Sequence, residues 1–523
     1  MKSDDLKKLI SQIKKYNLEK VFDTPQDFDK WVKKLTIKQI KNFNSLVVDP
    51  SEIQFPVNYL INENLLNCYD YNNRIIAMSK LKNGEGWYHI FDRLCSPIFL
   101  NSKNYYEDME MISRAPSVQH PLWIVNEDVF INSPYHKEDL KLMIEAKDTP
   151  KEDGNELDWL VEEALTVVAS NADSINSPYH QKDMQLIAHA GSECLQMSHS
   201  YPENSLNNLA TNTVSLKDKY HLENMQILAQ HHNLREFLYE LMTNPEIIKG
   251  KYYRNEINAL ASSKSMLKAI AIYFHILNPQ FSDLSLHSRN DCHSLLWNLG
   301  FDFEDTMELR RKNTTRGSNN PNYLKNLELL NQIDDKYVLF IESLLANKIF
   351  VSSQYCDYDL KLLLSIEDKD IFMDLYKYMF YKNSLNSPHH IKDLNIISKT
   401  NNSKLRKWLL SCATNENSIN SCNHDYDMEY ISRLDLDNID REILESIYYY
   451  LFAPVGINHP DHINILEKLS RGEKIQIEDT IESEDSILSH LDQLENNPES
   501  IIVSSVKEKP KVISRIKQIF RKR

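Results

Sequence analysis

Apolar and polar residues follow a pattern that recurs along most of the chain. Residues 419–432 show it most clearly, and close copies occupy residues 131–144, 175–188 and 385–398. Aligned on the residue equivalent to Asn420, which we call the anchor, twelve copies can be placed at spacings of 31 to 44 residues. The anchors are Asn67, Asn101, Asn132, Asn176, Lys217, Lys249, His287, Asn319, Ser352, Asn386, Asn420 and Asn458. Recurrence at this period is typical of stacked helical hairpins.

Each copy has apolar residues at the spacing of one helix face. The eighth residue after the anchor is Leu, Met or Ile in every copy, and the eleventh is apolar except at Asn298. With the fourth position they form an i, i+4, i+7 stripe, the buried face of an amphipathic helix. The residue after the anchor is Ser, Asp, Asn or Gly in ten copies, and Pro follows it in five. The residue after the anchor is therefore predicted to cap a helix. Where Pro follows it, Pro is predicted to occupy the first position of that helix.

A second apolar segment separates successive capped helices and predicts a partner helix. Such segments occupy residues 159–169, 234–242, 266–277, 337–345, 371–379, 405–413 and 439–451. Only nine glycines occur in 523 residues, and no sustained two-residue alternation suggests a strand. We therefore predict an all-α fold, a right-handed α-solenoid of about twelve helix-turn-helix repeats with a period of about 35 residues.

Four segments follow from this pattern. Residues 1–66 are predicted to be a helical N-terminal cap, and residues 67–472 the repeat solenoid. Residues 473–506 form an acidic linker, and residues 507–523 a basic amphipathic tail. Two long spacings also predict loop inserts near residues 147–155 and 191–208, either as part of a binding face or as neutral variation in a tolerant loop.

Histidine recurs at the fourth position after the anchor, at His136, His180, His221, His390, His424 and His462. In several copies Asp follows three residues later, which on a helix suits a metal site or an oriented general base. The same column holds Tyr in four copies and Asp291 and Cys356 in two others. Because tyrosine cannot freely replace a ligand or a base, we interpret the column as structural, a ring packed at the helix start. Replacing His390 by Tyr is then expected to be nearly silent.

Motifs for catalysis do not occur in the sequence. It contains no glycine-rich phosphate loop, Gly-x-Ser-x-Gly elbow, His-Glu-x-x-His or Cys/His zinc spacing. We therefore predict no catalytic residue, no cofactor and no metal ligand, and we favour a non-enzymatic role.

Charge and cysteine content suggest a location. The chain has a net charge of −15 and seven cysteines without a Cys-x-x-Cys pair, as expected for reduced thiols in a cytosol. The N-terminus lacks the apolar core of a signal peptide, and no apolar run is long enough to span a membrane. The expected location is cytoplasmic, or peripheral to a membrane if the tail binds lipid.

The basic tail is the one predicted contact site. Residues 507–523 contain eight Lys or Arg and one Glu, with apolar residues on one helical face. Such a helix binds an anionic membrane surface, a partner's groove or nucleic acid, or it remains a solvated tail. The predicted partner- or membrane-binding residues are Lys511, Arg515, Lys517, Phe520, Arg521, Lys522 and Arg523.

Three classes of function are open at this point. The leading hypothesis is a protein–protein interaction scaffold or adaptor whose helical repeats hold a protein or peptide. A nucleic-acid-binding repeat protein is the alternative, although an acidic body opposes phosphate binding. The third is an enzyme or toxin-like regulator with a site in a loop insert. The side chains five, six and nine residues after each anchor discriminate between the first two, because a nucleic-acid reader needs a continuous basic stripe there.

Overall fold

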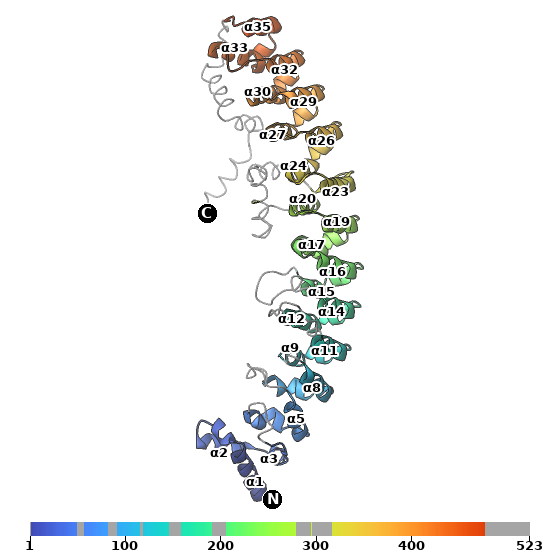
Figure 1. Cartoon of the computed structure of the whole chain (residues 1–523), viewed down its shortest axis with the longest axis vertical. Helices are drawn as coiled ribbons and strands as arrows, with labels where there is room; N and C mark the ends of the chain where they lie inside the picture. Colours follow the sequence, from blue (N-terminus) through green and yellow to red (C-terminus); the bar gives the residue numbers. More distant parts are fainter. Residues whose placement is uncertain are drawn as a thin grey trace, which may run out of the picture. The chain divides into compact units, whose positions relative to one another are not determined.

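The computed structural model describes residues 2–49, 57–81, 92–115, 119–145, 158–190, 205–278, 294 and 316–475. These residues lie in helices or in the turns between them, with no strand among them, so the described chain is all-α. The chain divides into an N-terminal unit, Met1–Ala261, and a C-terminal unit, Ser262–Arg523. Figure 1 labels the helices of both units, and each unit is described by itself below.

A helix begins at the fourth residue after the anchor of each described copy; we call these the repeat helices. In the N-terminal unit they are α5 (Tyr71–Met78), α8 (Tyr105–Arg114), α11 (His136–Glu145), α14 (His180–Ala188), α16 (His221–Gln230) and α19 (Tyr253–Ala261). In the C-terminal unit they are α23 (Tyr323–Gln332), α26 (Cys356–Leu364), α29 (His390–Lys399), α32 (His424–Ser432) and α35 (His462–Ser470). Apart from Ser294, the copy anchored at His287 lies outside the described residues.

The cap of the repeat helix differs from the prediction in its position. The Ser133 hydroxyl accepts a hydrogen bond from the Tyr135 backbone N–H at 3.1 Å, and its carbonyl accepts from His136 N–H at 3.3 Å. The predicted capping residue therefore satisfies a backbone donor, but it closes a tight turn that contains Pro134. The α-helix starts two residues later than predicted because this turn comes first.

The predicted partner helices are present. They are α12 (Asp158–Ala169), α17 (Arg235–Thr243), α20 (Met266–Leu277), α24 (Asp335–Leu345), α27 (Lys369–Tyr378), α30 (Ser403–Thr414) and α33 (Arg441–Phe452). Two further partner helices, α9 (Gln119–Ile124) and α15 (Leu206–Thr211), were not predicted.

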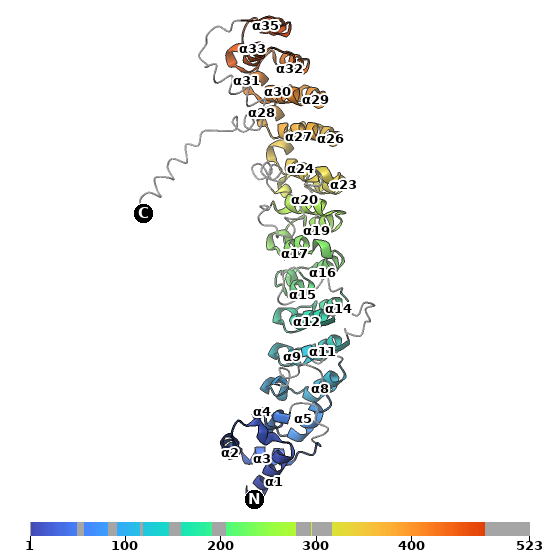
Figure 2. The ribbon, with the colours of Figure 1, turned by 60° about the vertical axis from the view of Figure 1, so that its left-hand side comes forward.

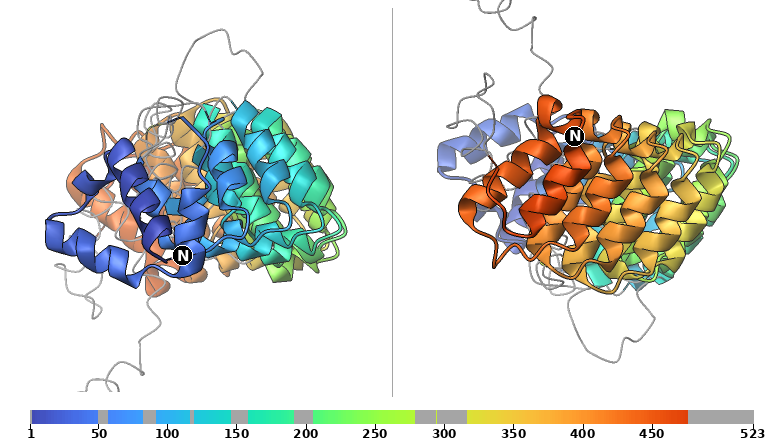
Figure 3. Two further views of the ribbon diagram at one scale, coloured as in Figure 1. Left: turned by 90° about the horizontal axis from the view of Figure 1, so that it is seen from below. Right: turned by 90° about the horizontal axis from the view of Figure 1, so that it is seen from above.

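Within each unit the repeat helices and the partner helices form two layers. In the N-terminal unit α8, α11, α14 and α16 contact one another in chain order and pack against α9, α12, α15 and α17 (Figure 2). In the C-terminal unit α29 contacts α32, and both pack against α30. The end-on views of Figure 3 show successive helices of one unit lying one behind the next.

A one-turn α-helix before the anchor of nine described copies was missed in the sequence. These short helices are α4 (Glu63–Leu66), α7 (Pro97–Leu100), α10 (Asp128–Ile131), α13 (Ala172–Ile175), α18 (Pro245–Ile248), α25 (Lys348–Val351), α28 (Lys382–Leu385), α31 (Glu416–Ile419) and α34 (Pro454–Ile457). Four residues are too few for a periodic signal. They explain the recurring anchor Asn, because the Asn420 side-chain amide donates to the Glu416 carbonyl at 2.8 Å and so closes the short helix.

The apolar columns form the core. The described side chains at the eighth and eleventh positions are at most 8% exposed, and Leu394 and Ile397 of α29 are fully buried. Burial of these side chains supplies the main favourable free energy of packing between neighbouring helices. The amphipathic pattern therefore identifies the buried face correctly.

The N-terminal helices are α1 (Lys2–Lys15), α2 (Pro25–Lys34) and α3 (Ile37–Asn44). Helices α1 and α3 pack together, whereas α2 has no fully buried residue. Trp31 of α2 is half-buried against Phe22, with ring centroids 5.4 Å apart. None of the described helices combines the length and apolar character needed to cross a membrane.

We expect Leu394→Ala and Ile397→Ala each to lower the free energy of unfolding by about 2 to 5 kcal/mol, because each leaves a cavity in a packed core. Urea unfolding followed by circular dichroism measures the loss. Ile391→Ala on the same helix is the control, because Ile391 is 40% exposed. An equal loss for all three substitutions would contradict the assignment of the buried face.

Candidate functional site

The histidines of the fourth position are among the most deeply buried polar side chains of the molecule. His180, His221, His390 and His424 are fully buried, and His136 and His462 are 3% and 1% exposed. Each is the first residue of its repeat helix. A buried imidazole needs hydrogen-bond partners for both ring nitrogens, and these partners define the arrangement.

Each imidazole reaches back to the preceding copy. Its Nε2 bonds the buried carboxylate that stands seven residues after the preceding anchor, at 2.7 to 3.1 Å. The pairs are His136–Asp108, His180–Asp139, His221–Asp183, His390–Asp359, His424–Asp393 and His462–Asp427. We call the seventh residue of one copy and the fourth of the next a junction pair. The pair joins two successive repeat helices.

Other junctions carry other pairs. The Arg74 guanidinium lies over the Tyr105 ring, with its central carbon 4.1 Å from the ring centroid. The Asn224 side-chain amide donates to the Tyr253 hydroxyl at 2.6 Å. The seventh-position residue thus changes with the ring it faces: Asp faces His, and Arg or Asn faces Tyr.

This pairing corrects the interpretation of the sequence. Reading each His with the Asp of its own helix missed its hydrogen-bond partner, which lies one copy earlier. A signal was present, because every copy with His at the fourth position follows a copy with Asp at the seventh. The pairing also changes the expectation for His390→Tyr. That substitution removes the hydrogen bonds that His390 makes to Asp359, so it is not expected to be silent.

The second ring nitrogen divides the histidines into two groups. Nδ1 of His136, His390 and His462 faces a backbone carbonyl six residues earlier, at 3.0 to 3.3 Å. At His136 and His462 both ring nitrogens therefore face acceptors, whereas Nδ1 of His390 also lies 3.4 Å from the Tyr378 hydroxyl. In His180, His221 and His424, Nδ1 instead faces the hydroxyl of Ser174, Ser215 or Ser418. A serine hydroxyl can donate to Nδ1, so a hydrogen bond of either direction fits this contact.

Electrostatics at the last junction pair agree with a cationic ring. Burial alone would lower the pKa of His462, but the hydrogen bond to Asp427, the carboxylate charge and the Gly456 carbonyl together raise this pKa above its ordinary value. Burial raises the pKa of the Asp427 carboxyl, and His462 opposes that rise. The pair is therefore held by charge as well as by a hydrogen bond.

Aromatic rings cover several of the histidines. Tyr135, Tyr179 and Tyr355, each three residues after its anchor, stack on the imidazole of the following copy at centroid distances of 5.1, 5.0 and 4.6 Å. These imidazole rings are buried, and both nitrogens of each ring have hydrogen-bond partners. In the part of the chain that the structure describes, no three His, Cys, Asp or Glu side chains converge as a metal site requires. The arrangement fastens neighbouring helices together.

The outward side of the repeat helices is chemically mixed. At the fifth position it presents Tyr106, Lys137, Gln181, Leu222 and Arg254 in the N-terminal unit, and Asp357, Ile391, Asp425 and Ile463 in the C-terminal unit. Ion pairs link neighbouring copies across this side, for example Lys137 with Glu107 and Lys392 with Asp425. Charges of both signs occur along it together with neutral side chains, so no continuous basic stripe forms on the described helices.

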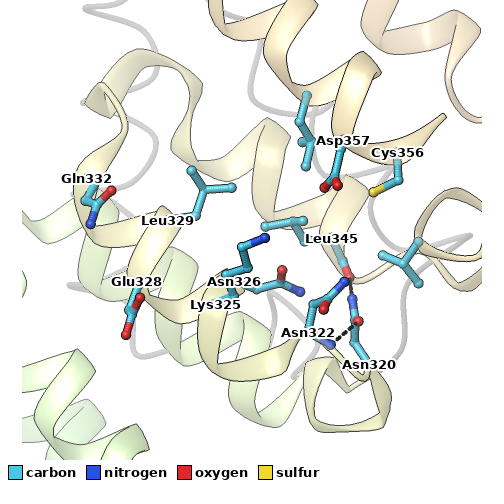
Figure 4. Close-up of a pocket in the computed structure, with 12 residues that line it drawn as sticks. Asn320, Asn322, Lys325, Asn326, Glu328, Leu329, Gln332, Leu345, Cys356 and Asp357 are labelled. Atoms are coloured by element: carbon cyan, nitrogen blue, oxygen red, sulfur yellow. Dashed lines mark hydrogen bonds between the residues drawn. The ribbon is translucent and has the colours of Figure 1, made fainter. Parts of the chain in front are cut away.

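A pocket of about 270 Å³ lies between α23 and α26 of the C-terminal unit (Figure 4). Asn326 and Cys356 line it, and they occupy the seventh and fourth positions of that junction. Burial, followed by the charges of Asp357 and Asp359, raises the pKa of the Cys356 thiol to about 12, so the thiol is neutral at physiological pH. The other lining residues are Asn320, Asn322, Lys325, Glu328, Leu329, Gln332, Leu345, Val351, Asp357 and Leu360.

The predicted tail site lies outside the described residues. Lys511, Arg515, Lys517, Phe520, Arg521, Lys522 and Arg523 all fall there, as do the insert at residues 147–155 and most of the insert at residues 191–208. The role proposed for these residues stays a prediction. Comparison of the chain with models of known families, with curated proteins and with solved structures finds no match.

We expect His424→Leu to lower the free energy of unfolding by about 3 to 5 kcal/mol, because it leaves the Asp393 carboxylate buried without its partner. The double variant His424→Leu/Asp393→Leu should recover part of this loss, since no unpaired charge remains. Urea unfolding of the two single variants and the double variant gives the coupling energy.

The control for this cycle is the exposed pair of Lys404 with Asp437, in which both side chains are 60% exposed. Lys404→Ala should cost less than about 1 kcal/mol, because water and salt screen the charges. Zero coupling between His424 and Asp393 would contradict their role in holding α29 to α32.

Stability should depend on pH through His462. Its pKa is raised in the folded protein, so the stabilisation is complete below about pH 6.5 and is lost as pH rises through the folded pKa. The urea midpoint should therefore fall as pH rises above about 6.5. In His462→Gln this pH dependence should shrink, and an unchanged dependence would assign it to other groups.

Proposed function

We propose that the protein is a non-enzymatic interaction scaffold, a right-handed α-solenoid of about twelve helical repeats that holds a protein or peptide partner. One observation carries the proposal. Six junctions between successive repeat helices carry the same His–Asp pair, whereas the side chains that the same helices present outward differ from copy to copy. Constant junctions with a varied outer surface are typical of repeat proteins that bind extended partners.

Packing between sequence neighbours supports the solenoid. The hydrogen bonds of the junction pairs run from each repeat helix to the one before it, for example from α14 to α11 and from α32 to α29. A protein stabilised by such nearest-neighbour contacts gains length by adding copies, and it exposes a large surface for its mass.

The outward side chains favour a protein over a nucleic acid. Nucleic-acid binding needs lysines and arginines that follow a phosphate backbone. On this side, however, several basic residues are paired with acidic ones of a neighbouring copy, as Arg254 is with Glu223. Exposed apolar side chains such as Tyr106, Leu324 and Ile391 lie between them. Mixed polar and apolar contacts suit a protein surface.

The experiment is an affinity purification with the full-length protein from its native extract, with and without nuclease. A second sample carries Gln in place of Lys511, Arg515, Lys517 and Arg521. We expect a protein to be retained in stoichiometric amount by both samples and after nuclease treatment. That protein should then bind purified chain directly.

A surface variant tests the location. Leu324→Ala with Ile391→Ala changes two exposed side chains of the outward side, and neither residue belongs to a junction pair. This variant should bind the retained protein at least about tenfold more weakly, a loss of about 1.4 kcal/mol. Binding that disappears with the tail substitutions or with nuclease would move the function to the tail or to nucleic acid.

A further inference from the structure

The junction between α23 and α26 lacks the ring that other junctions contain. Its fourth-position residue is Cys356, and its seventh-position residue is Asn326. At the next junction, His390 fills the equivalent space between α26 and α29, with Nε2 bonded to Asp359 at 2.9 Å and the Tyr355 ring stacked upon it. A thiol is much smaller than an imidazole. The pocket of about 270 Å³ opens beside Cys356.

Asn326 is buried in this pocket with an unused donor. The residue is 6% exposed, and among the described residues its Nδ2 has no hydrogen-bond partner. Figure 4 shows its carboxamide in the middle of the lining residues, with Asn322 on one side and Cys356 and Asp357 beyond it. A buried amide donor without a partner is destabilising, because it has lost its hydrogen bonds to water. A ligand that supplies an acceptor at this point would offset this destabilisation.

The remaining lining residues limit the chemistry of the ligand. Asn320 is already engaged, since its Oδ1 accepts from Asn322 N–H at 2.9 Å and its Nδ2 donates to the Leu345 carbonyl at 3.5 Å. Leu329, Leu345 and Leu360 supply apolar wall. At the exposed mouth stand the Glu328 and Asp357 carboxylates, which can accept from an N–H group. The pocket therefore suits a flat ring with an acceptor nitrogen directed inward and an N–H directed outward.

We propose that this pocket binds the neutral imidazole ring of a histidine side chain from a bound peptide. The ring occupies the space that the chain's own histidine fills at neighbouring junctions, one ring nitrogen accepts from Asn326 Nδ2, and the other donates to a carboxylate at the mouth. The inference rests on the proposed function for its biological setting, because a partner must deliver the histidine.

Size favours a ring attached to a chain over a ring alone. A cavity of about 150 Å³ is enough for a benzene ring, which is larger than imidazole. The pocket is larger than that and opens at the exposed side chains of Asn322, Lys325 and Asp357. The additional space accommodates the Cβ and part of the backbone of a peptide histidine.

The test is calorimetric titration of the full-length protein at pH 8 with three capped tripeptides, Gly-His-Gly, Gly-Ala-Gly and Gly-Phe-Gly, and with free imidazole. We expect Gly-His-Gly to bind at least about tenfold more tightly than the other two peptides, a difference of about 1.4 kcal/mol. Equal affinity for all three peptides would overturn the proposal. Free imidazole that binds as tightly as Gly-His-Gly would support recognition of the ring but overturn a peptide as its source.

Two variants place the binding in the pocket. Cys356→His with Asn326→Asp installs the junction pair found elsewhere and fills the space, so Gly-His-Gly binding should be lost. Asn326→Leu keeps the size of the side chain and removes the donor, and it should weaken binding at least about tenfold. Lys392→Ala on α29 is the matched control and should bind like the unchanged protein. Binding that survives the filled pocket would overturn the proposal, and circular dichroism confirms that each variant is folded.

The outcome is separable from that of the scaffold proposal. If the filled variant still retains the partner protein in affinity purification, the scaffold stands and the histidine pocket has no part in it. If Gly-His-Gly binds but no partner is retained, the pocket binds a ring and the scaffold proposal fails.

Discussion

In six of the described junctions, a hydrogen bond joins an imidazole at the start of one repeat helix to a carboxylate on the preceding repeat helix, and this contact fixes how the two helices fit together. Both groups are removed from water, so either one alone would be costly to bury. Together they satisfy each other only when the two helices lie in one register, as His424 and Asp393 do at 3.1 Å. The pair therefore specifies which helix follows which, beyond the stabilisation that apolar burial supplies.

Variation among the junctions shows how a chain of similar copies acquires local differences. Tyr105 takes the place of an imidazole above Arg74, and Tyr253 does so beside Asn224. At Cys356 the ring is replaced by a small thiol, and the structure has a pocket there. Since each junction is closed by its own pair, one can change while its neighbours remain packed. Changing the residues of a single junction can thus create a binding site inside an array of repeats.

The side chains that face the interior recur from copy to copy, whereas those on the surface of the same helices do not. The inward positions repeat because neighbouring copies must fit one another at close-packed density. The outward positions differ from copy to copy, and their charges are partly neutralised by neighbours, as in the pair of Lys137 with Glu107. A surface of this kind offers many small, distinct contact sites. This combination is what the proposed scaffold needs to hold an extended partner.

The sequence by itself determined the helical class, the repeat helices and their buried face, because the i, i+4, i+7 stripe that ends in Leu394 and Ile397 depends only on local periodicity. It also located the partner helices to within two residues in most cases. Only the tertiary structure decided that His180 bonds Asp139 of the preceding copy and not Asp183 of its own helix, since a contact between residues 41 positions apart leaves no periodic trace along one helix. The one-turn helices and the Asn326 pocket were likewise decided in three dimensions. Four residues carry no period, and an unpaired donor is defined by what surrounds it.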